Sequence, residues 1–300
     1  MNFDRHITSH LAQKRQTISI EFSPPRSEEA GRQILRTAEI LKEKIAPDFV
    51  SITYGAGGST RERTEEYARL LRNSFGFDVV AHLTCVGSSK DELRTIIREY
   101  RDSGLSNIMA LRGDPPKGQS DFRPHPKGCA YANELVELIR DEEPAFCIGV
   151  AGYPETHPEA PSPEVDLAKL KNKVDAGASF ITTQLFYDNS HFFSFLSRCR
   201  AAGITVPIIP GLMPALSLEQ VIRFGRMNGS SVPVELEDLL KATGEDPEAQ
   251  RRAGIEWTFR QAKELLEQGV SALHLYIMNR SDSALQLVDR LKGEGVLNRA

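Results

Sequence analysis

Long hydrophobic runs and paired cysteines are both missing from this 300-residue chain. No stretch approaches the roughly 18 apolar residues needed to cross a bilayer. The N-terminal segment also lacks the apolar core of a secretory signal. The four cysteines, Cys85, Cys129, Cys147 and Cys199, include no C-x-x-C pair, which favours reduced thiols over a disulfide scaffold or a zinc cluster. We therefore expect a cytoplasmic protein.

Several common enzyme signatures are absent as well. The chain has no Walker lysine motif, no G-x-G-x-x-G after its first apolar run, no G-x-S-x-G and no H-E-x-x-H. These absences argue against a P-loop NTPase, an open-sheet dinucleotide fold, an α/β-hydrolase and a zinc protease. His82 and His157 have no partner at metal-ligand spacing, so we expect no metal site. A net charge of −4 argues against nucleic acid as a main partner.

Short apolar runs rich in β-branched residues are what the chain does contain. They recur with starts mostly 27 to 40 residues apart, which fits one strand, one helix and two loops per unit. The eight runs are Thr17–Phe22, Phe49–Thr53, Val79–Thr84, Asn107–Leu111, Cys147–Ala151, Phe180–Gln184, Pro207–Pro210 and Ala272–Tyr276.

The segments between these runs carry helical patterns. Leu93, Ile96, Ile97 and Tyr100 are spaced by three and four residues, which predicts one buried helix face. Glycine follows several such segments, at positions 104, 177, 203 and 269. Glycine tolerates the left-handed conformation that ends a helix.

Eight β/α units on this short period favour a closed parallel barrel over an open doubly wound sheet. We therefore predict an α/β fold, a single (β/α)8 TIM barrel in which residues 1–300 form one domain. Two stretches break the period. Residues 114–129 are predicted to form a long loop, and residues 229–253 a small helical insertion before the last β/α unit.

Polar residues stand at the downstream end of nearly every predicted strand. In a barrel these ends form one face, which is where such enzymes bind and react. The pattern therefore predicts a polar cup above an apolar core. Its members include Glu21, Thr53, Tyr54, His82, Thr84, Arg112, Gly113, Asp114, Tyr153, His157, Gln184, Asn279 and Arg280.

Glu21 is distinctive because it lies inside an apolar run. Burial disfavours the ionised form of a carboxylic acid, which suits a general acid. The alternative is a buried ion pair with Arg26 or Arg280. Asp114 could equally cap a helix or form a turn.

Lys173 lies one turn after Lys169 in a predicted amphipathic helix. It could face solvent or contact a phosphate.

In these same stretches the sequence resembles the methylenetetrahydrofolate reductases. The matching motifs keep their order across nearly the whole chain, and the length resembles that of the bacterial, catalytic-domain-only form. They are Ser19–Arg26 (SIEFSPPR), Val50–Ala56 (VSITYGA), Ala81–Cys85 (AHLTC), Ala110–Asp114 (ALRGD), Gly152–Ala160 (GYPETHPEA), Lys173–Ala178 (KVDAGA), Thr183–Gln184, Ile209–Gly211 (IPG) and Asn279–Arg280.

The resemblance implies a (β/α)8 barrel that holds FAD non-covalently, commonly in a homotetramer. It implies transfer of a hydride from NADH or NADPH through FAD to 5,10-methylenetetrahydrofolate, giving 5-methyltetrahydrofolate for methionine synthesis. Both substrates would use the same side of the flavin, so ping-pong kinetics are expected. The expected partners are small molecules and other subunits, without nucleic acid or membrane.

The resemblance also implies residue roles. Glu21 matches the general acid that protonates the folate, and Asp114 matches the catalytic carboxylate near flavin and pterin. Gln184 matches a contact to folate and nicotinamide in turn, and Thr53 matches a nicotinamide-dinucleotide contact. Gln220, Phe224 and Arg280 match the substrate side. The FAD-binding matches are Tyr54, Ala56, His82, Arg112, Gly113, Tyr131, Ala132, Tyr153, His157, Ala160, Asp166 and Lys173.

Lys169 and Asn172 also belong to the predicted FAD site, in the helix expected near the phosphates. They stand where enterobacterial members of the family have Asn and Arg, so one positive charge has changed position.

Three other functions are alternatives to this one. The first is a different flavin barrel, such as a proline dehydrogenase. The second is a metal-dependent barrel hydrolase or aldolase, which the missing ligand motifs disfavour. The third is a non-catalytic folate- or nucleotide-binding protein. A carboxylate such as Glu21 within an apolar strand argues against that one, because binding alone gains nothing from it.

Overall fold

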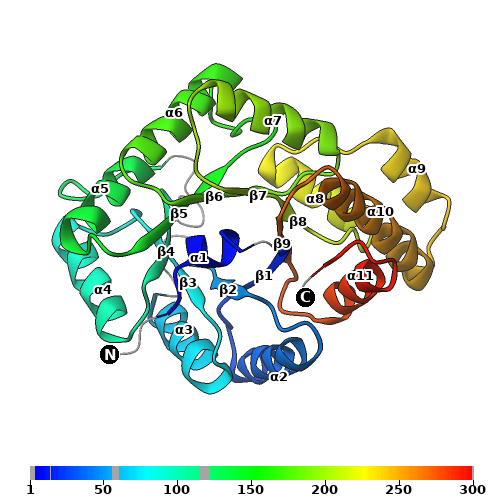
Figure 1. The fold of residues 1–300 in the computed structure, drawn as a ribbon, viewed down its shortest axis with the longest axis horizontal. Coiled ribbons are helices and arrows are strands. Elements are labelled where there is room, and N and C mark those ends of the chain that lie inside the picture. The colour runs from blue at the N-terminus through cyan, green and yellow to red at the C-terminus, as the bar shows by residue number, and fades with distance from the viewer. Residues whose placement is uncertain (1–3, 14, 56–60, 115–121, 299–300) are drawn as a thin grey trace.

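Nine parallel strands surrounded by helices make up this computed structural model, which describes residues 4–13, 15–55, 61–114 and 122–298 (Figure 1). The strands are β1 Thr17–Phe22, β2 Phe49–Ile52, β3 Val79–Thr84, β4 Asn107–Leu111, β5 Cys147–Gly152, β6 Phe180–Thr183, β7 Ile208–Ile209, β8 Gly211–Leu212 and β9 Ala272–Tyr276. Each predicted strand is present, with ends that differ by at most a few residues.

Closure of the sheet depends on one interrupted strand. The strand order is β7-β6-β5-β4-β3-β2-β1-β9-β8, so β7 pairs with β6 and β8 pairs with β9. Only Pro210 separates β7 from β8. Proline has no N–H to donate to a neighbouring strand, which accounts for the break. The predicted (β/α)8 barrel is therefore confirmed, with its seventh strand split in two.

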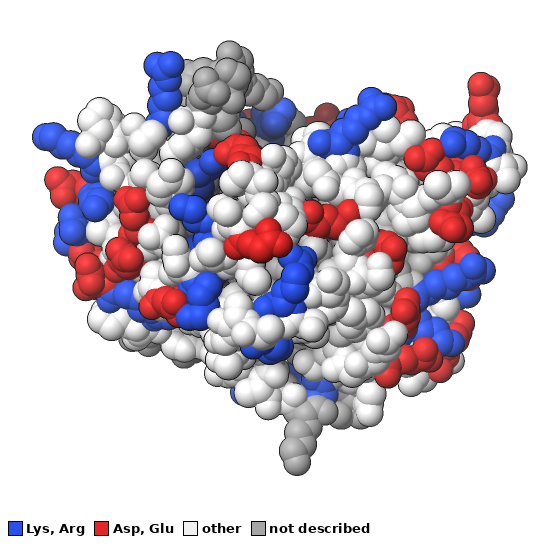
Figure 2. All heavy atoms as spheres, turned by 90° about the horizontal axis from the view of Figure 1, so that it is seen from above, with Lys and Arg blue, Asp and Glu red and all other residues white. Residues whose placement is uncertain are grey.

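Helices form a ring around the strands (Figure 1). They are α2 Glu28–Lys44, α3 Arg61–Phe75, α4 Lys90–Asp102, α5 Ala132–Glu142, α6 Pro163–Asp175, α7 Asn189–Ala201, α8 Leu218–Asn228, α9 Val234–Lys241, α10 Pro247–Glu267 and α11 Asp282–Gly293. The described residues include no helix long and apolar enough to cross a membrane. On the face drawn in Figure 2, acidic and basic side chains are interspersed.

The predicted helix signals are confirmed. Leu93, Ile96, Ile97 and Tyr100 are buried on one face of α4, which begins with a capping box formed by Ser89 and Glu92. The glycines at positions 104, 177, 203 and 269 all have positive φ. The predicted insertion contains α9 and the start of α10. Residues 122–129 of the predicted loop contain no helix or strand, and 115–121 lie outside the described residues.

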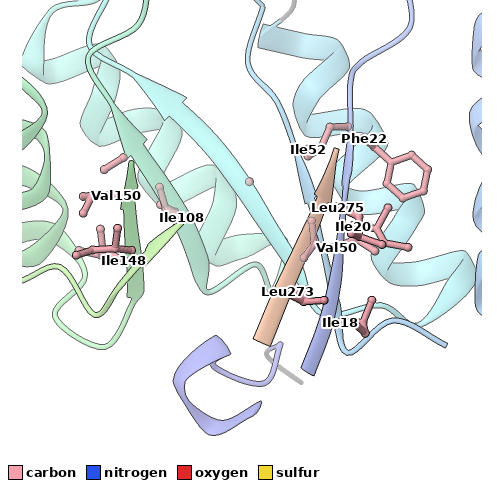
Figure 3. Close-up of a cluster of buried hydrophobic side chains, with 14 of the residues drawn as sticks. Ile18, Ile20, Phe22, Val50, Ile52, Ile108, Ile148, Val150, Leu273 and Leu275 are labelled. Atoms are coloured by element: carbon pink, nitrogen blue, oxygen red, sulfur yellow. The ribbon is translucent and has the colours of Figure 1, made fainter. Parts of the chain in front are cut away.

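Side chains along each barrel strand point alternately outward to the helices and inward to the barrel interior. On β1, Ile18, Ile20 and Phe22 point outward and pack against the helices in one large cluster (Figure 3), while Ser19 and Glu21 point inward. A second cluster, here called the lower cluster, fills the interior of the barrel on the side of α1. It consists of Ile7, Phe49, Val80, Met109, Cys147, Phe180, Ile209 and Ala272.

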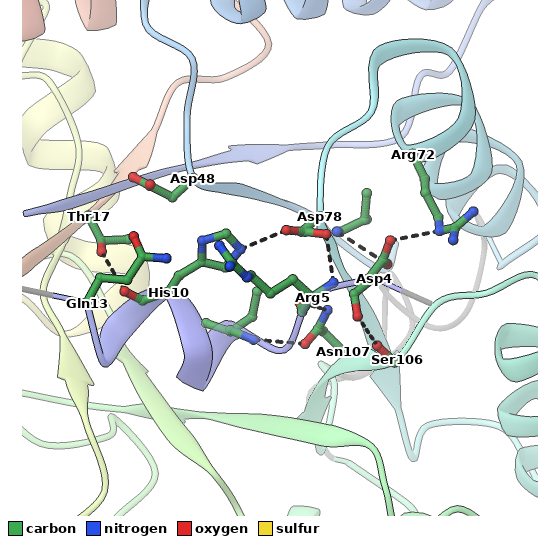
Figure 4. Close-up of polar contacts among 12 residues, drawn as sticks. Asp4, Arg5, His10, Gln13, Thr17, Asp48, Arg72, Asp78, Ser106 and Asn107 are labelled. Atoms are coloured by element: carbon green, nitrogen blue, oxygen red, sulfur yellow. Dashed lines mark hydrogen bonds and ion pairs between the residues drawn. The ribbon is translucent and has the colours of Figure 1, made fainter. Parts of the chain in front are cut away.

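A short helix, α1 (Ile7–Leu11), closes the end of the barrel where the strands begin (Figure 4). The sequence did not predict it. Ile7 donates its backbone N–H to Asn107 Oδ1 at 3.1 Å, and His10 Nε2 lies 2.7 Å from Asp78 Oδ2. Just before the helix, Asp4 accepts a hydrogen bond from Arg72 Nε at 2.7 Å. Among the described residues, α1 covers this end, and the cavity lined by Glu21 and His82 lies at the opposite end.

Ile7→Ala tests this seal, because the Ile7 side chain is fully buried in the lower cluster. Its truncation should lower the free energy of unfolding by about 2–4 kcal/mol, the usual cost of such a cavity. Chemical denaturation measures the change. Val234→Ala, at a side chain that is 68% exposed, is the control and should change stability little. Equal effects of the two substitutions would show that α1 does not seal the barrel.

Candidate active site

A cavity of about 670 Å³ opens at the end of the barrel opposite α1. It lies at the carboxyl ends of the strands and under the loops that follow them. Its volume lies within the range of small-molecule sites. The predicted site residues that line it are Glu21, Thr53, Tyr54, His82, Arg112, Gly113, Asp114, Ala132, Tyr153, His157, Lys173, Gln184 and Phe224.

The other predicted residues that the structure describes do not line this cavity. Asp166 supports its wall, because Asp166 Oδ2 accepts a hydrogen bond from the backbone N–H of His157 at 3.0 Å. Lys169 Nζ lies 5.0 Å from the centre of the Tyr131 ring, a cation–π contact. Gln220 Oε1 accepts a hydrogen bond from Leu216 N at 2.7 Å. Ala160, Asn172 and Arg280 also lie outside the cavity lining, and Arg280 is exposed. Ala56 lies outside the described residues.

Glu21 reaches the cavity from β1, and its side chain is 19% exposed. Its Oε2 atom lies 3.5 Å from Ser51 Oγ, 3.6 Å from His82 Nε2 and 3.8 Å from His274 Nε2. Arg26 and Arg280, the partners considered from the sequence, are both exposed. Its close polar neighbours are therefore two imidazoles and a hydroxyl.

His82 is held neutral beside this carboxyl group. Burial lowers its pKa to about 4, against a smaller opposing effect of the Glu21 charge. The imidazole therefore carries no charge near neutral pH.

After the carboxyl end of β4, the backbone at Gly113 lies close to the end of β3. Gly113 has φ +88, and a Cβ there would lie 2.9 Å from Thr84 Cβ, so no other residue fits without a shift. Thr84 lines the cavity, and within the part of the chain that the structure describes its buried hydroxyl has no hydrogen-bond partner. Arg112 donates to Glu159 Oε1 at 2.8 Å, which raises the pKa of the arginine. Asp114 is exposed and caps none of the described helices.

Lys173 lies on the inner face of α6, lines the cavity and donates from Nζ to Ala151 O at 2.6 Å. Burial lowers its pKa to about 8. Lys169, one turn earlier, is exposed. Of the two positions considered for Lys173, facing solvent or facing the site, the structure therefore gives the second. Beside it, the Tyr153 and His157 rings meet edge to face with centres 4.6 Å apart.

Sequence reasoning missed His274 and Tyr276, both on β9 and both lining the cavity. The available signal was alternation: residues two apart on a strand face the same side, so two polar rings in Ala272–Tyr276 point into the barrel together. The register places Ser19 opposite His274 and Glu21 opposite Tyr276. Met213, Met227 and Met278 also line the cavity and were not predicted.

His82 should make stability depend on pH, and His82→Gln tests this. Its folded pKa, about 4, lies below the ordinary value of 6.5. As the pH falls from 6.5 toward 4, the unfolded chain takes up this proton before the folded one does, so stability is lost in that window. Between pH 7 and pH 5 the wild type should lose about 2 kcal/mol more unfolding free energy than His82→Gln. Denaturant titrations of both proteins measure it; parallel curves would contradict a neutral, buried His82.

Comparisons with known proteins agree with one another. The family model for methylenetetrahydrofolate reductase matches residues 6–292. The 5,10-methylenetetrahydrofolate reductase of Escherichia coli K12 is 37% identical over 274 residues, which cover 91% of this chain and 90% of that protein. Methylenetetrahydrofolate reductase (NADH) 1 of Arabidopsis thaliana is 37% identical over 95% of this chain, which spans about half of the plant protein.

A solved structure shares the fold. It is an uncharacterized protein from Clostridium thermocellum, described as binding two copies of 5-methyl-5,6,7,8-tetrahydrofolic acid. The TM-score is 0.64 at 18% identity, over 96% of this chain and 98% of that one. With a family model over nearly its whole length and curated relatives at 37% identity, the chain belongs to the methylenetetrahydrofolate reductase family.

Proposed function

We propose that residues 1–300 form one catalytic domain that reduces 5,10-methylenetetrahydrofolate to 5-methyltetrahydrofolate, with NADH or NADPH as hydride donor and FAD as cofactor. The product would supply methyl groups for methionine synthesis. The observation that carries the proposal is the position of Glu21. It places a carboxyl group at the floor of a cavity that Asp114, Gln184 and Lys173 also line. Assembly into a homo-oligomer, commonly a tetramer in the family, belongs to the same proposal.

The cavity residues fit a flavin dinucleotide. The buried Thr84 hydroxyl has no hydrogen-bond partner among the described residues, and Gly113 removes the side chain that would fill the space beside it. Arg112 and Lys173 supply cationic donors for a diphosphate. FAD, when bound, supplies hydride transfer. We assign its binding to these residues with Tyr54, Ala56, His82, Asp114, Tyr131, Ala132, Tyr153, His157, Ala160, Asp166, Lys169 and Asn172.

Glu21 is the proposed general acid. Opening the methylene bridge of the folate requires a proton on the departing nitrogen. The Glu21 carboxyl group faces the cavity and has no arginine or lysine within ion-pair distance among the described residues. We assign to it the transfer of that proton to the substrate nitrogen. We propose that Asp114, which lines the same cavity, hydrogen-bonds the pterin.

One cavity must serve both substrates, which supports ping-pong kinetics. Gln184 and Phe224 line the same wall, and Gln184 Oε1 accepts a hydrogen bond from Leu185 N at 2.8 Å. Its Nε2 lies 3.3 Å from Asn228 Oδ1. We propose that Gln184 contacts folate and nicotinamide in turn and that Thr53 contacts the nicotinamide dinucleotide. Gln220, Phe224 and Arg280 are assigned to the substrate side.

Glu21→Gln tests this proposal through its two half-reactions. The purified wild type should show a flavin spectrum that NADH or NADPH bleaches and the folate restores. The variant keeps the shape of the side chain but loses the acid, so folate reduction should fall at least about 100-fold. Reduction of the flavin by the nicotinamide should remain within a few-fold of wild type.

Stopped-flow spectroscopy separates the two steps. Glu267→Gln, at an exposed carboxylate on α10, is the matched control and should leave both steps unchanged. Equal loss of both half-reactions in Glu21→Gln would contradict the role of Glu21, and a wild type that takes up no flavin would contradict the proposed function itself.

Lys173→Met tests the flavin site without measuring activity. Loss of a charged donor to a phosphate should weaken FAD binding about 10- to 100-fold. Fluorescence titration of the flavin-free protein measures the dissociation constant. Lys171→Met is the control from the same helix, because Lys171 pairs with Asp175 and does not line the cavity. Equal affinity in the two variants would remove Lys173 from the site.

A further inference from the structure

Arg112 and Glu159 form an ion pair with two hydrogen bonds in the wall of the cavity. Arg112 directly follows β4, Glu159 lies in the loop after β5, and both line the cavity. Arg112 Nη2 donates to Glu159 Oε1 at 2.8 Å, and Arg112 Nη1 donates to Glu159 Oε2. These hydrogen bonds raise the pKa of the arginine and lower the pKa of the glutamate. Both side chains are therefore charged near neutral pH.

The pair occupies the part of Arg112 that recognises phosphate. A guanidinium group binds a phosphate through two neighbouring N–H donors, either Nη1 with Nη2 or Nε with Nη2. Glu159 takes the first combination, and Gly113 O accepts a hydrogen bond from Nε at 3.3 Å. A phosphate can therefore make a two-donor contact with Arg112 only by displacing one of these acceptors. Gly113 O belongs to a backbone that is packed against Thr84, so Glu159 is the acceptor that can move.

The charges in the cavity make this displacement matter. Among the described residues that line it, the arginine and lysine side chains are Arg112 and Lys173, whereas Glu21, Asp114 and Glu159 carry carboxyl groups. An anionic diphosphate is repelled by carboxylates and needs cations close by. As long as Glu159 neutralises Arg112, Lys173 is the cation that remains for the diphosphate.

Glu159 can leave Arg112 without disturbing the core. Its side chain is 56% exposed, against 21% for Arg112. Its backbone N–H donates to His157 Nδ1 at 3.0 Å, and the N–H of Ala160 donates to His157 O at 2.8 Å. The turn that carries Glu159 is thus held by its own hydrogen bonds. The carboxylate can rotate into water while this turn stays in place.

We propose that Glu159 is an internal anion that competes with the flavin diphosphate for Arg112. It keeps the guanidinium group in position in the flavin-free protein and gives way when the phosphates bind. The exchange lowers affinity, because an ion pair that is already formed must break before the new one is gained. Glu159 thereby sets how tightly the cofactor is held. The inference rests on the proposed function, in which FAD is the cofactor.

Glu159→Gln tests the inference through flavin affinity. The amide keeps the size of the side chain and loses its charge, so the dissociation constant for FAD should fall about three- to tenfold, the scale of one partly exposed ion pair. Riboflavin, which has no phosphate, should bind the variant and the wild type equally. In an Arg112→Gln background, the gain from Glu159→Gln should shrink to less than about twofold, because no pair remains to be broken.

Glu142→Gln is the matched control. Glu142 also pairs with an arginine, Arg98, but it lies at the end of α5 and does not line the cavity. Its substitution should leave the affinities for FAD and riboflavin unchanged. Fluorescence titration of the flavin-free proteins measures all of these dissociation constants.

Three results would overturn the inference: an FAD dissociation constant that is unchanged or higher in Glu159→Gln, an equal gain for FAD and riboflavin, or an undiminished gain in the Arg112→Gln background. If circular dichroism shows that the flavin-free protein does not fold, the rate of FAD release from the loaded enzyme decides. That rate should then be lower in Glu159→Gln than in the wild type, and an equal or higher rate counts against the inference. A wild type that takes up no flavin would instead overturn the proposed function.

Discussion

Alternation of side chains along parallel strands is the constraint on which the rest of this molecule depends. Once β8 pairs with β9 and the sheet closes, every second residue must lie inside a narrow barrel. Residues such as Ile18 and Ile20 then pack against the helices, and Ser19 and Glu21 face inward. Near the start of the strands the interior is apolar and sealed by α1, while near their ends it is polar and open. Side-chain alternation in a closed barrel thus gives one apolar, covered end and one polar end that carries the candidate active site.

At the end of the barrel that carries the candidate active site, the barrel wall shields titratable groups from water. His82 and Lys173 both lose part of their tendency to carry charge, with pKa values lowered by burial to about 4 and about 8. Glu21 lies beside two imidazoles and a hydroxyl, with no lysine or arginine within ion-pair distance among the described residues. These residues stand on strands or helices that pack tightly on the barrel. The protein therefore contributes placement and protonation state, while the proposed cofactor contributes the reactive chemistry.

Backbone geometry limits which residues can occupy the rim. Gly113 adopts a positive φ against Thr84, and Thr156, Met278 and Asn279 adopt positive φ without being glycine. Such conformations cost free energy and persist only where the surroundings enforce them. Asn279 has such a restraint, because its side chain bonds both backbone groups of Ser23 across the barrel mouth. The loops after β1 and β9 are thereby tied together beside the Glu21 strand.

The sequence by itself determined the strands, the helix faces and the polar strand ends, because these follow from local periodicity and from glycine and capping residues. It also identified Glu21, Asp114, Lys173 and Gln184 as cavity residues, through their position after apolar runs and through the family resemblance. Only the tertiary structure decided which side chains meet. Helix α1 is too short for its hydrophobic periodicity to predict a helix. Its position depends on hydrogen bonds to Asp78 and Asn107, which lie far along the chain. The contact of His274 with Ser19 and Glu21 joins the first and last strands, and so exists only because the barrel closes.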